Sequence, residues 1–177
     1  MPDEFFRNLL AGHPKLVMWD MSLGYGADIL STLNYYAIGD PLNLLYGFVS
    51  PKNTETMYNF MIVLRMYLAG ITFIMYARKM KKRSYGTVIG ALVYVFCGFC
   101  FRLGLRHPFF LNPMIYFPLL CLGIEKIYQK QRPYLFIVMI YVSAISNYYF
   151  FYMLTIFSVI YAWIRFYKYT EKDRIKN

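Results

Sequence analysis

Five residues have the types and positions from which chemistry could be built: Asp20, Arg65, Arg102, Arg106 and His107. A carboxylate such as Asp20 can take a proton from a hydroxyl group, although beside a glycine-rich turn it could equally cap a helix. Arginines can hold an anionic group, but at the end of an apolar segment they could instead anchor the chain at lipid headgroups. His107, before Pro108, is open to a catalytic or a structural role.

Arg65 is the one charge inside the apolar run from Met57 to Ala77. An arginine inside a membrane usually faces a protein interior, so both a phosphate contact and a pairing with a carboxylate or carbonyl groups remain open. Asp40 precedes Pro41, which predicts an N-cap with proline at the first helical position. Cys97 and Cys100 have the spacing of a redox pair, but they lie in an apolar run, where we expect no redox site. No cluster has zinc-ligand spacing, so we predict no metal site.

The composition favours a membrane protein. Hydrophobic residues make up 59% of the 177-residue chain and charged residues 16%, against about 45–50% and about 25% in soluble domains. Aromatic residues reach 21%, which excludes a disordered chain, and three scattered cysteines exclude a disulfide scaffold. The net charge of +10 would suggest nucleic-acid binding in a soluble protein. In an apolar chain, the position of the charges matters more.

The basic residues alternate with long apolar runs. Because uncovered backbone groups are costly in lipid, runs of this length are expected to be helical. Basic clusters mark the cytoplasmic side. The clusters are Arg78–Arg83 (without the intervening Met80), then Lys126, Lys130 and Arg132, then Arg165, Lys168, Lys172, Arg174 and Lys176. Together they carry the whole positive surplus, which we interpret as an orientation signal.

The uncharged run from Tyr134 to Ile164 is too long for one crossing. As one helix it would extend about 46 Å at 1.5 Å per residue, against a hydrocarbon core of about 30 Å. It would also place the last basic cluster outside the cell. A break at Ser146-Asn147 solves both problems, because polar side chains can cap broken helices.

We therefore predict an all-α integral membrane protein, a multi-pass helical bundle with its C-terminus in the cytoplasm. Residues 1–56 are expected to form an extracytoplasmic loop with amphipathic interfacial helices at Asp3–Leu10 and Ala27–Ile38. The bundle would occupy 57–166, and 167–177 would be a cytoplasmic tail. The expected membrane segments are about 57–77, 85–103, 109–125, 133–146 and 148–165.

Several strings resemble the YfhO family of bacterial membrane proteins. They keep the family's order and cover most of the chain, from about Phe5 to Trp163. The strings are Trp19–Gly26 (WDMSLGYG), Leu33–Tyr36 (LNYY), Gly39–Leu45 (GDPLNLL), His107–Pro113 (HPFFLNP) and Ser146–Phe150 (SNYYF). Family members begin with a membrane helix and an acidic motif ahead of the Trp-Asp stretch. The family is much longer than 177 residues, so this chain resembles only its N-terminal part, and we expect it to be a fragment of a larger protein. The first helix and the acidic motif are absent ahead of Trp19, so we expect the fragment to be inactive on its own.

The resemblance implies a GT-C type glycosyltransferase that uses a polyprenyl-phosphate-linked sugar as donor. The acceptor would be a cell-envelope polymer such as the lipoteichoic acid of Gram-positive bacteria. In that interpretation Asp20 is the catalytic carboxylate, and Arg65, Arg102, Arg106 and His107 bind the substrate phosphate. We predict no cofactor and no nucleic-acid partner, and the sequence leaves a need for a divalent metal open. The alternative is a transporter or flippase subunit for an envelope precursor, because broken helices also build transporter sites.

Overall fold

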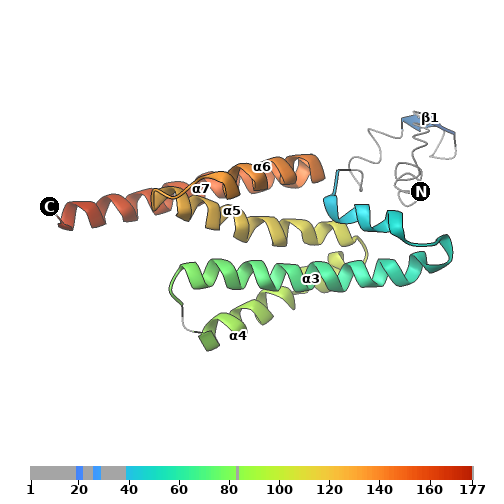
Figure 1. Cartoon of the computed structure of the whole chain (residues 1–177), viewed down its shortest axis with the longest axis horizontal. Helices are drawn as coiled ribbons and strands as arrows, with labels where there is room; N and C mark the ends of the chain where they lie inside the picture. Colours follow the sequence, from blue (N-terminus) through green and yellow to red (C-terminus); the bar gives the residue numbers. More distant parts are fainter. Residues whose placement is uncertain (1–18, 22–25, 29–38, 83, 177) are drawn as a thin grey trace.

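The computed structural model describes residues 19–21, 26–28, 39–82 and 84–176. Helices dominate the described residues, as expected for an all-α membrane protein. The longest are α3 (Thr54–Lys79), α5 (Asn112–Tyr128) and α7 (Tyr148–Lys176), with the shorter α4 (Ser84–Val95) and α6 (Tyr134–Ser146) between them. They run side by side as a bundle (Figure 1). By length and composition, three helical stretches could cross a membrane: Thr54–Lys79, Pro108–Tyr128 and Tyr148–Tyr167.

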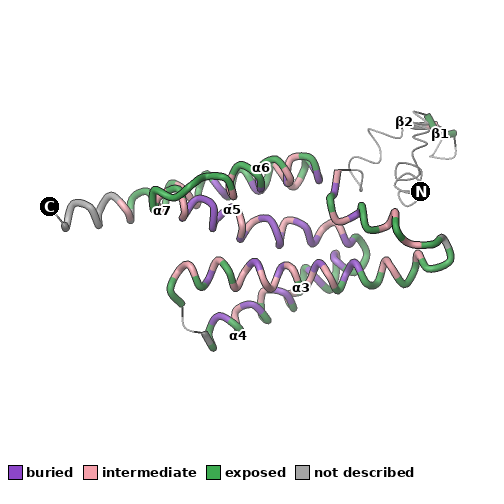
Figure 2. Tube along the Cα trace, viewed as in Figure 1, coloured by how far each residue is buried: buried purple, intermediate pink, exposed green. Residues whose placement is uncertain are grey.

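Helix α5 is the centre of the bundle. In an 18-residue window of its membrane-length stretch, 72% of the residues are buried, against 11% in that of α7. Figure 2 shows the same contrast along the chain. It packs against α3, α6 and α7. Gly123 permits the close approach of α6, because a Cβ atom there would lie 2.9 Å from the Cα atom of Phe136. The outer faces of α4, α6 and α7 expose many large apolar side chains, which suits contact with lipid.

The break in the long apolar run lies at Asn147, between α6 and α7. Its backbone is extended, with φ −166° and ψ 114°. Its side-chain oxygen accepts hydrogen bonds from the backbone N–H groups of Tyr149 and Phe150, at 3.0 and 3.1 Å. The residue therefore caps the first turn of α7, and the two helices form a hairpin (Figure 1).

The α4 helix covers only the first part of the expected segment 85–103. It ends at Val95, and a π-helical turn, η3 (Cys100–Gly104), follows. The interruption lies at Phe96 and Cys97, and the chain becomes helical again at Gly98. The short helix η4 (Pro108–Leu111) then leads into α5.

Short elements precede α3. Strands β1 (Trp19–Asp20) and β2 (Ala27–Asp28) pair antiparallel, so the expected helix Ala27–Ile38 is wrong at its first two residues, while 29–38 lie outside the described residues. The expected helix Asp3–Leu10 also lies outside them. Two 3-10 helices follow, η1 (Pro41–Phe48) and η2 (Pro51–Asn53). Proline occupies the first turn of each, where its missing N–H is not needed.

Candidate functional site: a buried polar cluster beside an exposed basic loop

A buried ion pair joins α3 to the segment that precedes it. Nη2 of Arg65 lies 2.6 Å from Oδ2 of Asp40, and each side chain is 1% exposed. Asp40 also caps η1, because its Oδ1 accepts the backbone N–H of Leu42 at 3.0 Å. The N-cap predicted from Asp40-Pro41 is confirmed. Of the two roles left open for Arg65, the structure shows the pairing with a carboxylate.

Two asparagines complete the cluster. Nη2 of Arg65 donates to Oδ1 of Asn43 at 2.7 Å, and its Nε donates to Oδ1 of Asn112 at 2.9 Å. The amide nitrogen of Asn112 donates in turn to Oδ2 of Asp40 at 2.7 Å. Side-chain hydrogen bonds of this cluster thus link three elements: η1 with its cap, α3 and the first residue of α5. A buried ion pair needs this kind of support, because each charge has lost its water.

The same region holds the end of α6. The hydroxyl groups of Tyr116 and Ser146 lie 3.0 Å apart, and the Ser146 hydroxyl lies 3.5 Å from the carbonyl oxygen of Gly39. Gly39 must be small here, because a Cβ atom would lie 1.6 Å from the carbonyl oxygen of Ile145. At this end of the bundle, η4 leads into α5, and α6 reaches its last residue. We call it the η4 end.

An exposed basic stretch, which we call the exposed loop, runs from Arg102 in η3 to His107 before η4, at the η4 end. Arg102, Arg106 and His107 are all exposed, and His107 precedes η4, five residues before Asn112. The hydroxyl group of Tyr58 on α3 donates to the carbonyl oxygen of Arg106 at 2.7 Å, which ties the loop to α3. Among the described residues, the structure shows no carboxylate paired with either arginine.

The His107 ring lies within an aromatic group. Its centroid is 5.7 Å from that of Phe109 and 5.3 Å from that of Phe110. Phe110 in turn meets Phe150 of α7 edge to face, with centroids 5.0 Å apart. Cation and apolar surface therefore adjoin at this loop, an arrangement that suits a ligand with an anionic head and an apolar tail.

The site residues predicted from the sequence divide into three groups. Arg102, Arg106 and His107 lie together on the exposed loop, whereas Arg65 is buried in the polar cluster with its charge neutralised by Asp40. Asp20 lies in β1, and its side chain is outside the described residues. Within those residues, no group of three or more His, Cys, Asp or Glu side chains could hold a metal ion.

A second buried polar network lies at the other end of the bundle, and the sequence interpretation missed it. Glu125 of α5, 1% exposed, forms a salt bridge with Arg165 of α7. Its carboxylate also accepts hydrogen bonds from the hydroxyl groups of Tyr161, at 2.6 Å, and Tyr169, at 3.0 Å. The available signal was an isolated acid at the end of an apolar helix, with an arginine at the end of another. The network fixes α7 to α5.

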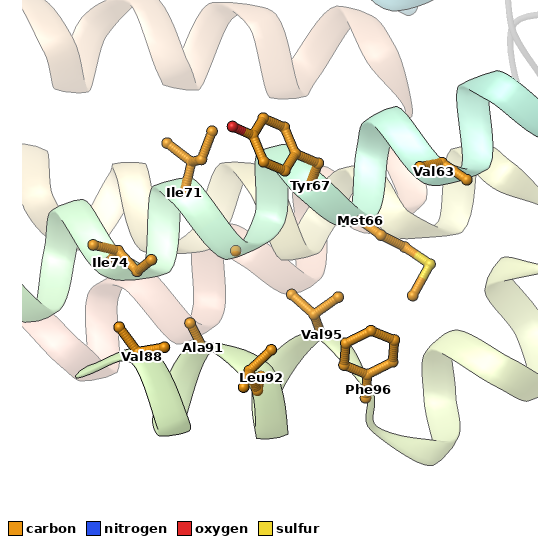
Figure 3. Close-up of a pocket in the computed structure, with 11 residues that line it drawn as sticks. Val63, Met66, Tyr67, Ile71, Ile74, Val88, Ala91, Leu92, Val95 and Phe96 are labelled. Atoms are coloured by element: carbon orange, nitrogen blue, oxygen red, sulfur yellow. The ribbon is translucent and has the colours of Figure 1, made fainter. Parts of the chain in front are cut away.

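An apolar groove lies between facing side chains of α3 and α4. It encloses about 450 Å³ and is lined almost wholly by carbon. Figure 3 shows side chains of the two helices facing each other across it, among them Met66, Ile74, Val88 and Val95. Gly70 also lines the groove and adds no side chain to fill it.

The apolar helices and their buried ion pairs define a helical membrane protein. The model of the family described as "Bacterial membrane protein YfhO" matches residues 3–177. This chain belongs to the YfhO family. It is 29% identical over 160 residues to a Bacillus subtilis (strain 168) protein named "Uncharacterized protein YfhO". That match covers 83% of this chain and 19% of the relative, so the chain spans about a fifth of the relative's length. No solved structure matches the chain.

Proposed function

We propose that the protein is a membrane glycosyltransferase of the GT-C type, which transfers a sugar from a polyprenyl-phosphate donor to a cell-envelope acceptor such as lipoteichoic acid. The observation that carries the proposal is the exposed loop of Arg102, Arg106 and His107 at the η4 end. Its cations and aromatic rings suit a lipid-linked phosphate, whose head is anionic and whose tail is apolar.

The orientation that this function needs follows from the charges. Arg78 and Lys79 end α3, and Lys81 and Lys82 follow it, at the end of the bundle opposite to the η4 end (Figure 1). Basic residues favour the cytoplasmic side, so the η4 end and residues 1–56 face outward, with the C-terminus in the cytoplasm. A lipid-linked donor and an envelope polymer meet at that outer face.

The chemistry divides among three parts of the site. Arg102 and Arg106 stabilise the phosphate that leaves when the sugar is transferred, since fixed cations are worth most where charge develops. The carboxylate of Asp20 accepts the proton of the acceptor hydroxyl. The buried cluster of Arg65 and Asp40 holds η1 and the start of α5 in place, so Arg65 positions the site and does not touch the phosphate.

A transporter or flippase subunit for an envelope precursor is the second candidate. The observation that favours it is the position of Arg65, twelve residues into the 26-residue helix α3. Charged residues inside membrane segments often mark a transport path. Against it, the Arg65 charge is already neutralised by Asp40 and shielded from solvent, whereas Arg102 and Arg106 on the exposed loop have no carboxylate partner among the described residues.

The test compares variants of the complete gene product in cells that lack their own copy. Arg106→Gln and Asp20→Asn should abolish glycosylation of the envelope polymer at unchanged protein level, whereas Lys52→Gln, an exposed residue of η2, should leave it intact. Glycosylation that persists in the Arg106 variant would remove that residue from the site. Loss of envelope-precursor export with sugar transfer intact would favour the transporter.

A further inference from the structure

Two lysines adopt a backbone conformation that side chains disfavour. In the described ranges, the positive φ angles of residues other than glycine belong to Lys81, at 55°, and Lys130, at 56°. Lys81 lies in the turn between α3 and α4, and Lys130 lies in the turn between α5 and α6. Left-handed positions after a helix are usually filled by glycine and sometimes by asparagine, because a Cβ atom is crowded there.

Both turns close their helices in the same way. In each, two successive backbone N–H groups bond back to carbonyl groups of the last helical turn, in the Schellman pattern. The bonds are Lys81 to Arg78 at 2.9 Å, Lys82 to Ala77 at 3.2 Å, Lys130 to Ile127 at 2.9 Å and Gln131 to Lys126 at 2.9 Å. The pattern requires a left-handed residue, so the chain twice places a lysine where glycine would cost less.

The helix dipole does not account for this choice. A cation near the C-terminus of a helix is favourable, but Arg78 and Lys79 already end α3, and Lys126 lies in the last turn of α5. The helix dipole therefore does not explain why a further lysine occupies the left-handed position, and an orientation signal does not require that backbone position either.

The two turns lie together at the end of the bundle opposite to the η4 end (Figure 1). Nζ of Lys79, at the end of α3, donates to Oε1 of Gln131 across the gap between the turns, at 3.4 Å. The exposed bases of the two turns and of the adjoining end of α3 make up what we call the two-turn patch: Arg78, Lys81, Lys82, Lys130 and Arg132.

The two-turn patch keeps its positive charge. The nearby acid Glu125 is buried and already paired with Arg165, and Asp40 is paired with Arg65 at the η4 end. Across the described part of the chain, the structure shows no carboxylate paired with a base of the patch. Several cations at the ends of membrane-length helices form a site for an anion at headgroup depth.

We propose that the two-turn patch binds the phosphate headgroup of an anionic membrane lipid, with Lys81 and Lys130 as its central contacts. Each lysine lies just beyond the end of its helix and is exposed. The proposal is independent of the activity proposed for the η4 end.

The test follows the thermal unfolding midpoint of the chain in a neutral detergent. The added probes are cardiolipin, phosphatidylcholine and inorganic phosphate. One double variant, Lys81→Gln with Lys130→Gln, removes the two charges and keeps the strained backbone. A second double variant, Lys81→Gly with Lys130→Gly, removes the two charges and also the backbone strain. Lys52→Gln, an exposed lysine near the other end of α3, is the matched control.

We expect cardiolipin, but neither phosphatidylcholine nor inorganic phosphate, to raise the midpoint of the unmodified chain and of the Lys52 variant. The glutamine variant should lose most of that rise. The glycine variant should also lose it, yet start from a higher midpoint without lipid, because its turns are relaxed. A full rise in the glutamine variant would overturn the proposal. An equal rise with inorganic phosphate would also overturn it, in favour of a small-anion site.

Discussion

Arg65 and Asp40 form an ion pair with 2.6 Å between Nη2 and Oδ2, and both side chains are 1% exposed. The pair joins the middle of a membrane-length helix to the cap of η1, and Asn112 brings the start of α5 into the same cluster. The position of η1 against α3 therefore depends on one buried charge on each side.

Loss of either partner should be strongly destabilising. Asp40→Asn or Arg65→Met leaves the other charge buried and unpaired, which costs about 3–5 kcal/mol. The double variant should recover much of that loss, because no lone charge remains. Denaturant titration in detergent micelles measures the free energy of unfolding. Glu55→Gln, which changes an exposed acid at the start of α3, should shift it by less than about 0.5 kcal/mol. Additive effects of the two cluster substitutions would contradict the pairing.

The contact of α5 with α6 should not tolerate a side chain at Gly123. Gly123→Val should cost about 1–3 kcal/mol through overpacking, because the new Cβ atom would lie 2.9 Å from the Cα atom of Phe136. Gly86→Ala is the matched control, since nothing lies within 4 Å of its Cβ position. That change should stabilise α4 by up to about 1 kcal/mol. Equal effects of the two substitutions on the unfolding free energy would show that the helices are further apart.

The α6–α7 hairpin should depend on the cap at Asn147. Asn147→Ala removes the acceptor for the N–H groups of Tyr149 and Phe150 and should cost about 0.5–2 kcal/mol. Asn147→Asp keeps an acceptor in place and should cost less. Both values come from the same unfolding titration. If the aspartate and alanine variants were equally destabilised, the cap would not be what stabilises the start of α7.

The orientation of the bundle predicts where reporters will lie. A reporter fused after Lys82 should lie in the cytoplasm, and one inserted near Lys52 should lie outside the cell. The reason is that the basic clusters retain their end of the bundle in the cytoplasm. Paired fusions to alkaline phosphatase and a fluorescent protein measure the two sides. The reverse pattern would contradict the orientation and, with it, an outward-facing exposed loop.

The sequence predicts features that depend on neighbouring residues. Asp40-Pro41 carries its own N-cap signal, which the structure confirms. The all-α membrane fold follows from apolar runs of membrane length. Ser146-Asn147 likewise indicates a break, and the structure places Asn147 between two helices.

Partners that are distant in the chain could not be predicted in the same way. Nothing near Arg65 identifies Asp40 or Asn112 as its partner, because the pairing arises only when η1, α3 and α5 pack together. The salt bridge of Glu125 with Arg165 was missed for the same reason, since the two residues looked like separate charges at helix ends. The early end of α4 at Val95 was hidden because the apolar pattern continues through Gly98 to Phe101.

Sugar transfer by the purified, complete gene product tests the central proposal most directly. The assay supplies a radiolabelled sugar on a polyprenyl phosphate together with lipoteichoic acid in detergent. We predict that label appears in the polymer and that Arg106→Gln lowers the rate by about 100-fold or more, as expected when a cation that stabilises developing charge is removed. The Lys52→Gln enzyme should keep its rate. Absence of label in the polymer from a folded, donor-bound protein would contradict the proposed activity.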